Sequence, residues 1–154
     1  MRRFAILLTA ILLLLAPAPP RARAAPQLPP HAWLFGAWTG GLFPAPAQLT
    51  ALACLAHPTV IFTQDLVLRA TLTDFAYIQR QVETVRGAGQ GVEFRLIGAT
   101  QPAAGAGLLG AAIPAPGFGC ESPDALHVQR HSENEISFPG CADFPNPLIR
   151  CPSR

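Results

Sequence analysis

The chain has no lysine among its 154 residues, and its eleven basic residues are all arginines. Without a lysine amine it can neither form a Schiff base nor complete a phosphate-binding P-loop. It also lacks G-x-S-x-G, H-E-x-x-H, C-x-x-C and any glycine-rich phosphate loop. Because Asp, Glu and His are also few, we expect a protein that is not an enzyme and that carries no cofactor or metal.

The first 24 residues have the pattern of a cleaved signal peptide. Arg2 and Arg3 form a positive n-region, residues 4–16 form an apolar h-region, and residues 22–24 (ARA) offer a small-x-small cleavage motif. Thirteen apolar residues rise only about 20 Å as a helix, less than the roughly 30 Å of a hydrocarbon core. A short signal anchor is the alternative. We therefore expect a periplasmic or secreted mature chain without a stable membrane span.

Removal of residues 1–24 changes the charge balance. Four arginines leave with the signal peptide, so seven arginines face nine carboxylates and the net charge falls from +2 to −2. Nucleic acid and anionic membranes need a basic face, so neither is expected as a partner. The partners that remain are a small apolar molecule and another envelope or secreted protein.

Four cysteines lie in the mature part: Cys54, Cys120, Cys141 and Cys151. An even count in an exported chain indicates two disulfides, with three possible connectivities. A zinc site is the rival interpretation, but no pair has the close spacing that structural zinc favours. We favour Cys120–Cys141, at the base of a predicted hairpin, and Cys54–Cys151, which would hold the C-terminal tail.

The mature sequence predicts a proline-rich extended leader over residues 25–32 and a single β-rich domain over residues 33–154. Residues 33–43 contain strand formers interrupted by glycines, and residues 49–57 favour a short helix. Alternating or β-branched runs predict further strands at 59–63, 66–72, 92–97, 125–131, 135–138 and 147–151. Within 92–97 we expect Val92, Phe94 and Leu96 to face inward.

Residues 75–86 fit two structures. Phe75, Ile78, Val82 and Val85 fall on one helical stripe. As a strand, residues 77–86 would form the middle of a meander, with turns on both sides. We favour the strand, because strands are predicted close by on either side.

Six to eight short strands with glycine and proline turns predict a mainly β domain with at most one or two short helices. Its fold would be a small antiparallel meander, either a barrel or a half-barrel. Gly36-Ala37-Trp38 resembles the G-x-W of the first strand in calycins, the group of lipocalins, avidin-like barrels and small bacterial protease-inhibitor barrels. The resemblance implies that Trp38 packs at the closed end of a barrel.

Residues 99–119 hold five glycines, three prolines and seven alanines, and we expect a long loop without regular structure. Leu108, Leu109, Ile113 and Phe118 make it apolar for a loop, so they either cover a pocket or await a partner. Trp33, Phe35 and Trp38 form a candidate aromatic wall for a small ligand, with a role in the core as the alternative.

Two polar groups complete the candidates. Arg69, Arg80 and Arg95 lie on neighbouring predicted strands, where they either converge on an anion or pair across strands with Asp65, Glu83 or Glu93. Residues 127–135 hold His127 and His131, either on a solvated hairpin or as a metal or acid–base site.

The sequence thus predicts an exported, disulfide-stabilised, non-enzymatic β-domain. It would bind a small apolar molecule inside a barrel or a protein at its rim. The alternative is an inhibitor or interaction module that acts through residues 99–119. An enzyme, the least favoured alternative, would need a pocket that gathers His127 or His131 with a carboxylate.

Overall fold

A computed structural model describes residues 27–55, 59–72, 74, 76–97, 100–102, 112–114 and 117–152. Within these ranges the chain forms ten β-strands, one short α-helix and one 3-10 turn. The predicted mainly β fold is therefore confirmed. In the part of the chain that is described, no helix has the length and apolar character needed to cross a membrane.

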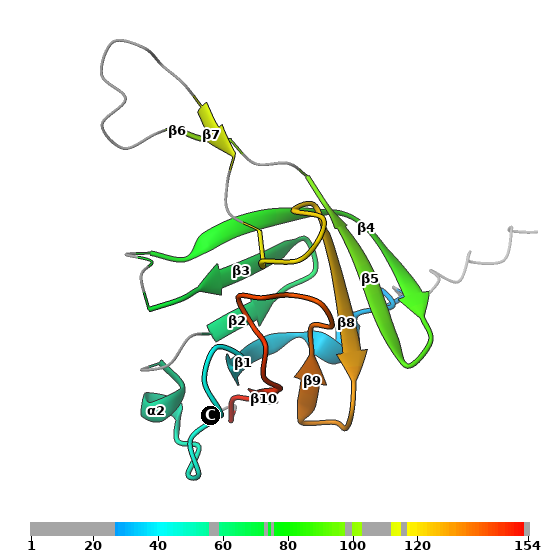
Figure 1. The fold of residues 1–154 in the computed structure, drawn as a ribbon. Coiled ribbons are helices and arrows are strands. Elements are labelled where there is room, and N and C mark those ends of the chain that lie inside the picture. The colour runs from blue at the N-terminus through cyan, green and yellow to red at the C-terminus, as the bar shows by residue number, and fades with distance from the viewer. Residues whose placement is uncertain are drawn as a thin grey trace, which may run out of the picture.

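Eight of the strands close into an antiparallel barrel. They are β1 (Gly36–Gly40), β2 (Thr59–Phe62), β3 (Leu66–Ala70), β4 (Ile78–Ala88), β5 (Gly91–Leu96), β8 (Ala125–Arg130), β9 (Glu135–Ser137) and β10 (Leu148–Arg150). Each pairs with its neighbours in chain order, and β10 closes onto β1 (Figure 1). Trp38 of β1 lies opposite Val60 of β2 on one side and Arg150 of β10 on the other. Closure leaves these strands without an unpaired edge.

The strand interpretation of residues 75–86 is confirmed by β4, and a bulge explains the helical spacing. The pairing of β4 with β5 shifts register between Val82 and Thr84. A bulge inserts one extra residue, so the inward side of the strand moves by one position. Val82 and Val85 can therefore both pack against the core, although they are three residues apart.

The interior of the barrel is filled by large side chains. Phe62 packs against Phe94 and Phe138, and the rings of Phe118, Phe138 and Phe144 contact one another with centroids 5.6 to 5.9 Å apart. Val92, Phe94 and Leu96 all face inward as predicted. These rings belong to one hydrophobic core cluster inside the barrel.

One end of the barrel, which we name the η1 end, is closed by the 3-10 turn η1 (Ala32–Leu34). The indole Nε1 of Trp38 donates to the carbonyl of Leu34 at 2.8 Å. The Nε2 atom of His31 lies 3.2 Å and 3.1 Å from the carbonyl oxygens of Thr63 and Gln64 in the β2–β3 turn. The predicted leader, residues 25–32, thus contains a buried residue, His31, near its end. Of the predicted strand region 33–43, only residues 36–40 form a strand.

The opposite end, which we name the loop end, carries the longer connections: residues 41–58, 71–77, 97–124 and 138–147. The first includes the predicted short helix, α2 (Ala51–Leu55). The third contains β6 (Thr100–Pro102) and β7 (Ala112–Pro114), which form a separate two-stranded sheet that stands clear of the barrel strands in Figure 1. The expectation that residues 99–119 contain no regular structure is therefore wrong for these six residues. Pro102 and Pro114 close their strands, a position where the missing N–H is tolerated.

Both favoured disulfides are present. Cys54 of α2 pairs with Cys151, just after β10, and Cys120 pairs with Cys141, with Cα atoms 6.0 Å and 3.8 Å apart. The second pair joins the connection that follows β7 to the loop between β9 and β10. Two disulfides fit an oxidising compartment outside the cytoplasm.

Candidate functional site

Two arginines lie inside the loop end of the barrel. Arg69 of β3 and Arg80 of β4 are 4% and 1% exposed. Their inward orientation follows from the strand alternation, because Val67 and Ile78 on the same faces are also buried. Arg69 lies opposite Ile78 and Arg80 opposite Val67, so the two guanidiniums come from adjacent strands one diagonal step apart. We name Arg69 and Arg80 the arginine anchor.

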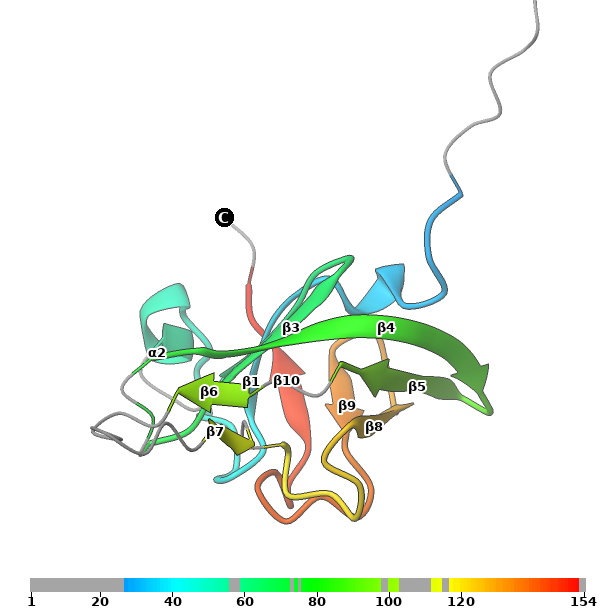
Figure 2. The same cartoon turned by 90° about the horizontal axis from the view of Figure 1, so that it is seen from above.

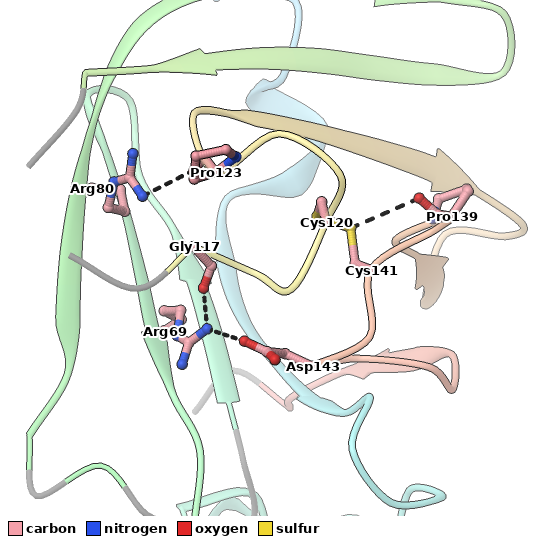
Figure 3. The surroundings of a disulfide bond; sticks show 8 residues. All are labelled: Arg69, Arg80, Gly117, Cys120, Pro123, Pro139, Cys141 and Asp143. Atoms are coloured by element: carbon pink, nitrogen blue, oxygen red, sulfur yellow. Dashed lines mark hydrogen bonds and ion pairs between the residues drawn. A yellow bond between two sulfur atoms is a disulfide. The ribbon is translucent and has the colours of Figure 1, made fainter. Parts of the chain in front are cut away.

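Arg69 holds two loops against the barrel (Figure 3). Its Nη1 donates to the carbonyl of Gly117 and, at 2.5 Å, to the carboxylate of Asp143. Its Nη2 lies 3.4 Å from the carboxylate of Asp74 in the β3–β4 connection. The guanidinium carbon lies 5.9 Å from the ring centres of both Phe118 and Phe144, so its cation also contacts aromatic faces.

Arg80 holds the same connection from its other side. Its Nη1 donates to the carbonyl of Pro123 at 3.0 Å. Its Nη2 donates to the carbonyl of Ile97 at 3.3 Å and to the carboxylate of Asp124. The amide of Leu96 also donates to the carbonyl of Asp124 at 2.8 Å.

The contacts of the arginine anchor fall at both bases of one chain segment. Ile97 is the last residue before residues 98–116, and Gly117 is the first residue after them. We name residues 98–116 the excursion; it contains β6 and β7. Ala142 donates to the carbonyl of Gly119 at 2.8 Å beside the Cys120–Cys141 disulfide, so the outgoing base is tied down twice. The excursion therefore starts and ends on a rigid base.

The anchor combines buried cations with more exposed carboxylates. The side chains of Asp74, Asp143 and Asp124 are 16%, 36% and 51% exposed. The Nε atoms of Arg69 and Arg80 are buried and have no hydrogen-bond partner among the described residues. A buried charge without a partner is strongly destabilising. Loss of the contact between a guanidinium and the carboxylate that neutralises it would therefore be costly, and this cost keeps the arginine and the loop together.

Of the aromatic candidates of the sequence, Trp33, Phe35 and Trp38 lie near Arg150 at the η1 end, and Phe118 lies near Arg69 at the loop end. Trp38 and Phe118 are buried in the core, and Trp33 packs against its edge under the guanidinium of Arg130, 4.8 Å from the ring centre. Phe35 lines a groove on the outside of the barrel. The aromatic wall and the calycin-like resemblance both stay predictions.

The structure describes only some of the apolar candidates in and next to the excursion. Ile113 lies in β7 opposite Gln101 of β6. Leu108 and Leu109 lie outside the described residues. Phe118, just beyond the excursion, joins the core and contacts Arg69.

The third arginine does not join the other two. Arg95 lies on the outer face of β5, where its Nε is 3.1 Å from the carboxylate of Glu83, one of the partners proposed for cross-strand pairing. Arg69 and Arg80 instead pair with aspartates of the loops. The three guanidiniums thus do not converge on one anion.

His127 and His131 lie on the outside of the barrel. A pocket of about 380 Å³ beside Cys120–Cys141 gathers His127 with Glu93 and Glu121, the residue types an acid–base site requires. No hydrogen bond joins His127 to either carboxylate, and Glu93 lies 3.6 Å from Arg86 instead. His131 Nε2 is 2.7 Å from the hydroxyl of Ser137. In the described part of the chain, no group of three His, Cys, Asp or Glu side chains could hold a metal ion.

Sequence reasoning did not foresee the burial of Arg69 and Arg80 or their aspartate partners. The sequence does contain an indication that Arg80 is buried, because Arg80 shares one face of its strand with the apolar residues Ile78 and Val82. For Arg69 the signal pointed the other way, since Leu66, Leu68 and Ala70 share the opposite face of β3 and look more suited to the core.

Comparison with known proteins places the chain in no family: no family model, no curated protein and no solved structure matches it.

Proposed function

We propose that this chain is an exported, non-enzymatic binding module that presents the excursion, residues 98–116, to a protein partner. Export through a cleaved signal peptide over residues 1–24 is part of the proposal, and the two disulfides support it. The observation that carries it is the arginine anchor, whose donors hold the carbonyls of Ile97 and Gly117 at the two bases of the excursion.

A fixed base supports binding by a protruding segment. A loop that must be ordered on binding loses conformational entropy, so a segment held at both ends binds with less loss of affinity. The burial of two arginines costs free energy, because each guanidinium loses its hydration. In this chain the two buried arginines hold Ile97 and Gly117, the residues on either side of the excursion.

The composition of this region supports a protein partner with an apolar surface. No Asp, Glu, Lys or Arg occurs between Arg95 and Glu121, and Leu108-Leu109 lies near the middle of this stretch. Apolar residues that are exposed next to one another mark contact sites for other proteins.

The barrel interior supports a ligand less well. A small apolar molecule inside would have to displace the contacting rings of Phe118, Phe138 and Phe144. It would also have to separate Arg69 from the carboxylate of Asp143, which covers the loop end.

The proposal is tested with the mature protein immobilised as bait for the exported proteins of its source organism. We expect a protein retained by the wild-type chain and by Leu52→Ser, an exposed leucine on α2, but not by Leu108→Ser/Leu109→Ser. With that protein purified, calorimetry should show at least tenfold weaker binding to the double variant.

Three results would overturn the proposal. The first is a partner that binds the double variant as tightly as the wild-type chain. The second is that no exported protein is retained. The third is an apolar molecule found at one equivalent per chain in organic extracts of the purified protein, which would assign the function to the interior instead.

A further inference from the structure

A groove of about 730 Å³ lies on the outside of the barrel at the η1 end, away from the excursion. Its lining includes Phe35, Gly36, Leu49, Ile149, Arg150 and Pro152. Leu49 stands just before α2, and the Cys54–Cys151 disulfide ties α2 to the end of β10. The disulfide therefore holds one apolar wall of the groove against the strand that carries Arg150.

The guanidinium of Arg150 is fixed by the chain around it. Nε donates to the carbonyl of Glu133 at 3.1 Å, Nη1 to that of Phe35 at 3.0 Å and Nη2 to that of Trp33 at 2.6 Å. It also lies 4.2 Å from the centre of the Trp38 ring. A guanidinium has five N–H donors, so one on Nη1 and one on Nη2 are left for another acceptor.

Gly36 lies next to Nη1 of Arg150. Gly36, which lines the groove, has a φ of +118°, and a Cβ placed on it would meet only Nη1 of Arg150, at 3.8 Å. Such a backbone conformation strongly favours glycine. A side chain at this position would therefore come into contact with the guanidinium of Arg150.

The positive charge at this end is not neutralised by an ion pair. Within the described residues neither Arg150 nor Arg130, whose guanidinium covers Trp33, has a carboxylate within 4.0 Å. Burial, together with the charge of Arg130, lowers the pKa of Arg150, and Glu133 acts in the opposite direction. Glu135 lies across from Ile149 in the β9–β10 pair, also without an ion pair to either arginine. A bound anion would relieve the repulsion between the two cations.

We propose that this groove binds a small organic carboxylate, with its anionic head on Nη1 and Nη2 of Arg150 and its apolar body against Leu49, Ile149 and Pro152. The N–H donors of a guanidinium bind the oxygen atoms of a carboxylate through charge-assisted hydrogen bonds. The site is separate from the excursion, so it adds a ligand to the proposed function and does not depend on it.

The test uses 4-phenylbutyrate as probe and 4-phenylbutyramide as its uncharged counterpart. The two tryptophans of the chain lie beside Arg130 and Arg150, so indole fluorescence and the indole N–H signals in NMR report on this end directly. We expect one equivalent of the carboxylate to bind and to shift both signals. The amide should bind at least tenfold more weakly.

Variants locate the site without disturbing the Arg150–Trp38 contact. Leu49→Asp places a negative charge in the wall of the groove and should weaken binding of the carboxylate at least tenfold. The matched control, Leu72→Asp, places the same charge at an exposed position at the loop end and should leave binding unchanged.

The proposal is overturned if the amide binds as well as the carboxylate, because the guanidinium would then have no role. It is overturned equally if Leu49→Asp and Leu72→Asp behave alike, or if the carboxylate fails to bind at millimolar concentration. None of these outcomes bears on the excursion, whose test uses different variants and a protein partner.

Discussion

The guanidinium of Arg150 lies 4.2 Å from the centre of the Trp38 ring, and the two residues are paired across the neighbouring strands β10 and β1. The last strand of the chain thus covers the indole of the first, while the indole N–H donates to the carbonyl of Leu34 in η1. Figure 2 shows β1 and β10 side by side where the barrel closes. One contact therefore joins barrel closure, the η1 end and the proposed anion groove.

Replacement of Trp38 should be severely destabilising. Trp38 is fully buried, and truncation of a buried aromatic residue to alanine costs about 3–5 kcal/mol through lost transfer energy and a residual cavity. We expect Trp38→Ala to lower the free energy of unfolding by that amount in urea titrations. Phe43→Ala, at a half-exposed position, is the control and should stay within about 1 kcal/mol of wild type. A Trp38→Ala protein as stable as the control would contradict the core role.

The two disulfides should differ in their contribution to stability. In the chain-entropy description a bridge stabilises more when it closes a longer loop, and the two pairs are separated by 97 and 21 residues. This gives about 4.7 kcal/mol for Cys54–Cys151 and about 3.3 kcal/mol for Cys120–Cys141. Paired alanine substitutions measured by chemical unfolding should preserve that order. Labelling of the denatured, unreduced wild-type protein should find no free thiol.

Arg80 should contribute far more than an exposed arginine. Arg80→Met leaves the carbonyls of Ile97 and Pro123 without their donor, and an unsatisfied buried polar group costs about 1–3 kcal/mol. Arg95→Met breaks the exposed pair with Glu83 and should cost less than about 1 kcal/mol. Unfolding titrations of the two methionine variants provide the comparison.

Hydrogen exchange offers a local measurement of the same anchor. The Leu96 amide donates to the carbonyl of Asp124, the residue that Arg80 holds. Arg80→Met should accelerate exchange of this amide, and Arg95→Met should not. Unchanged protection in Arg80→Met would mean that the base of the excursion does not depend on the arginine.

Gly91 should not tolerate a side chain, because β5 and β8 approach closely at this residue. A Cβ on Gly91 would overlap the carbonyl oxygen of Val128, whereas a Cβ on Gly87 in β4 meets nothing within 4 Å. We expect Gly91→Ala to lower the melting temperature by several degrees, since about 1 kcal/mol shifts it by about 2–8 °C in domains of this size. Gly87→Ala should be neutral or slightly stabilising, since it restricts the unfolded chain.

Much of the architecture follows from local patterns in the sequence. The alternation of Val92, Phe94 and Leu96 determines which side of β5 faces inward, because period two assigns every second side chain to one face. The strands predicted on either side of β4 gave the right choice of strand for this segment, and the even cysteine count predicted two disulfides, which the structure contains. These features depend on residues close in sequence or on a small set of possible pairings.

Other features exist only once the barrel is closed. Arg69 meets Asp143 and Gly117 across 74 and 48 residues, and no local pattern encodes contacts at that separation. The bulge that brings both Val82 and Val85 to the core depends on the register with β5. The sequence by itself determined the strands of the barrel and the number of disulfides. Tertiary structure decided that Arg69 and Arg80 are buried, because the aspartates that neutralise them come from distant loops.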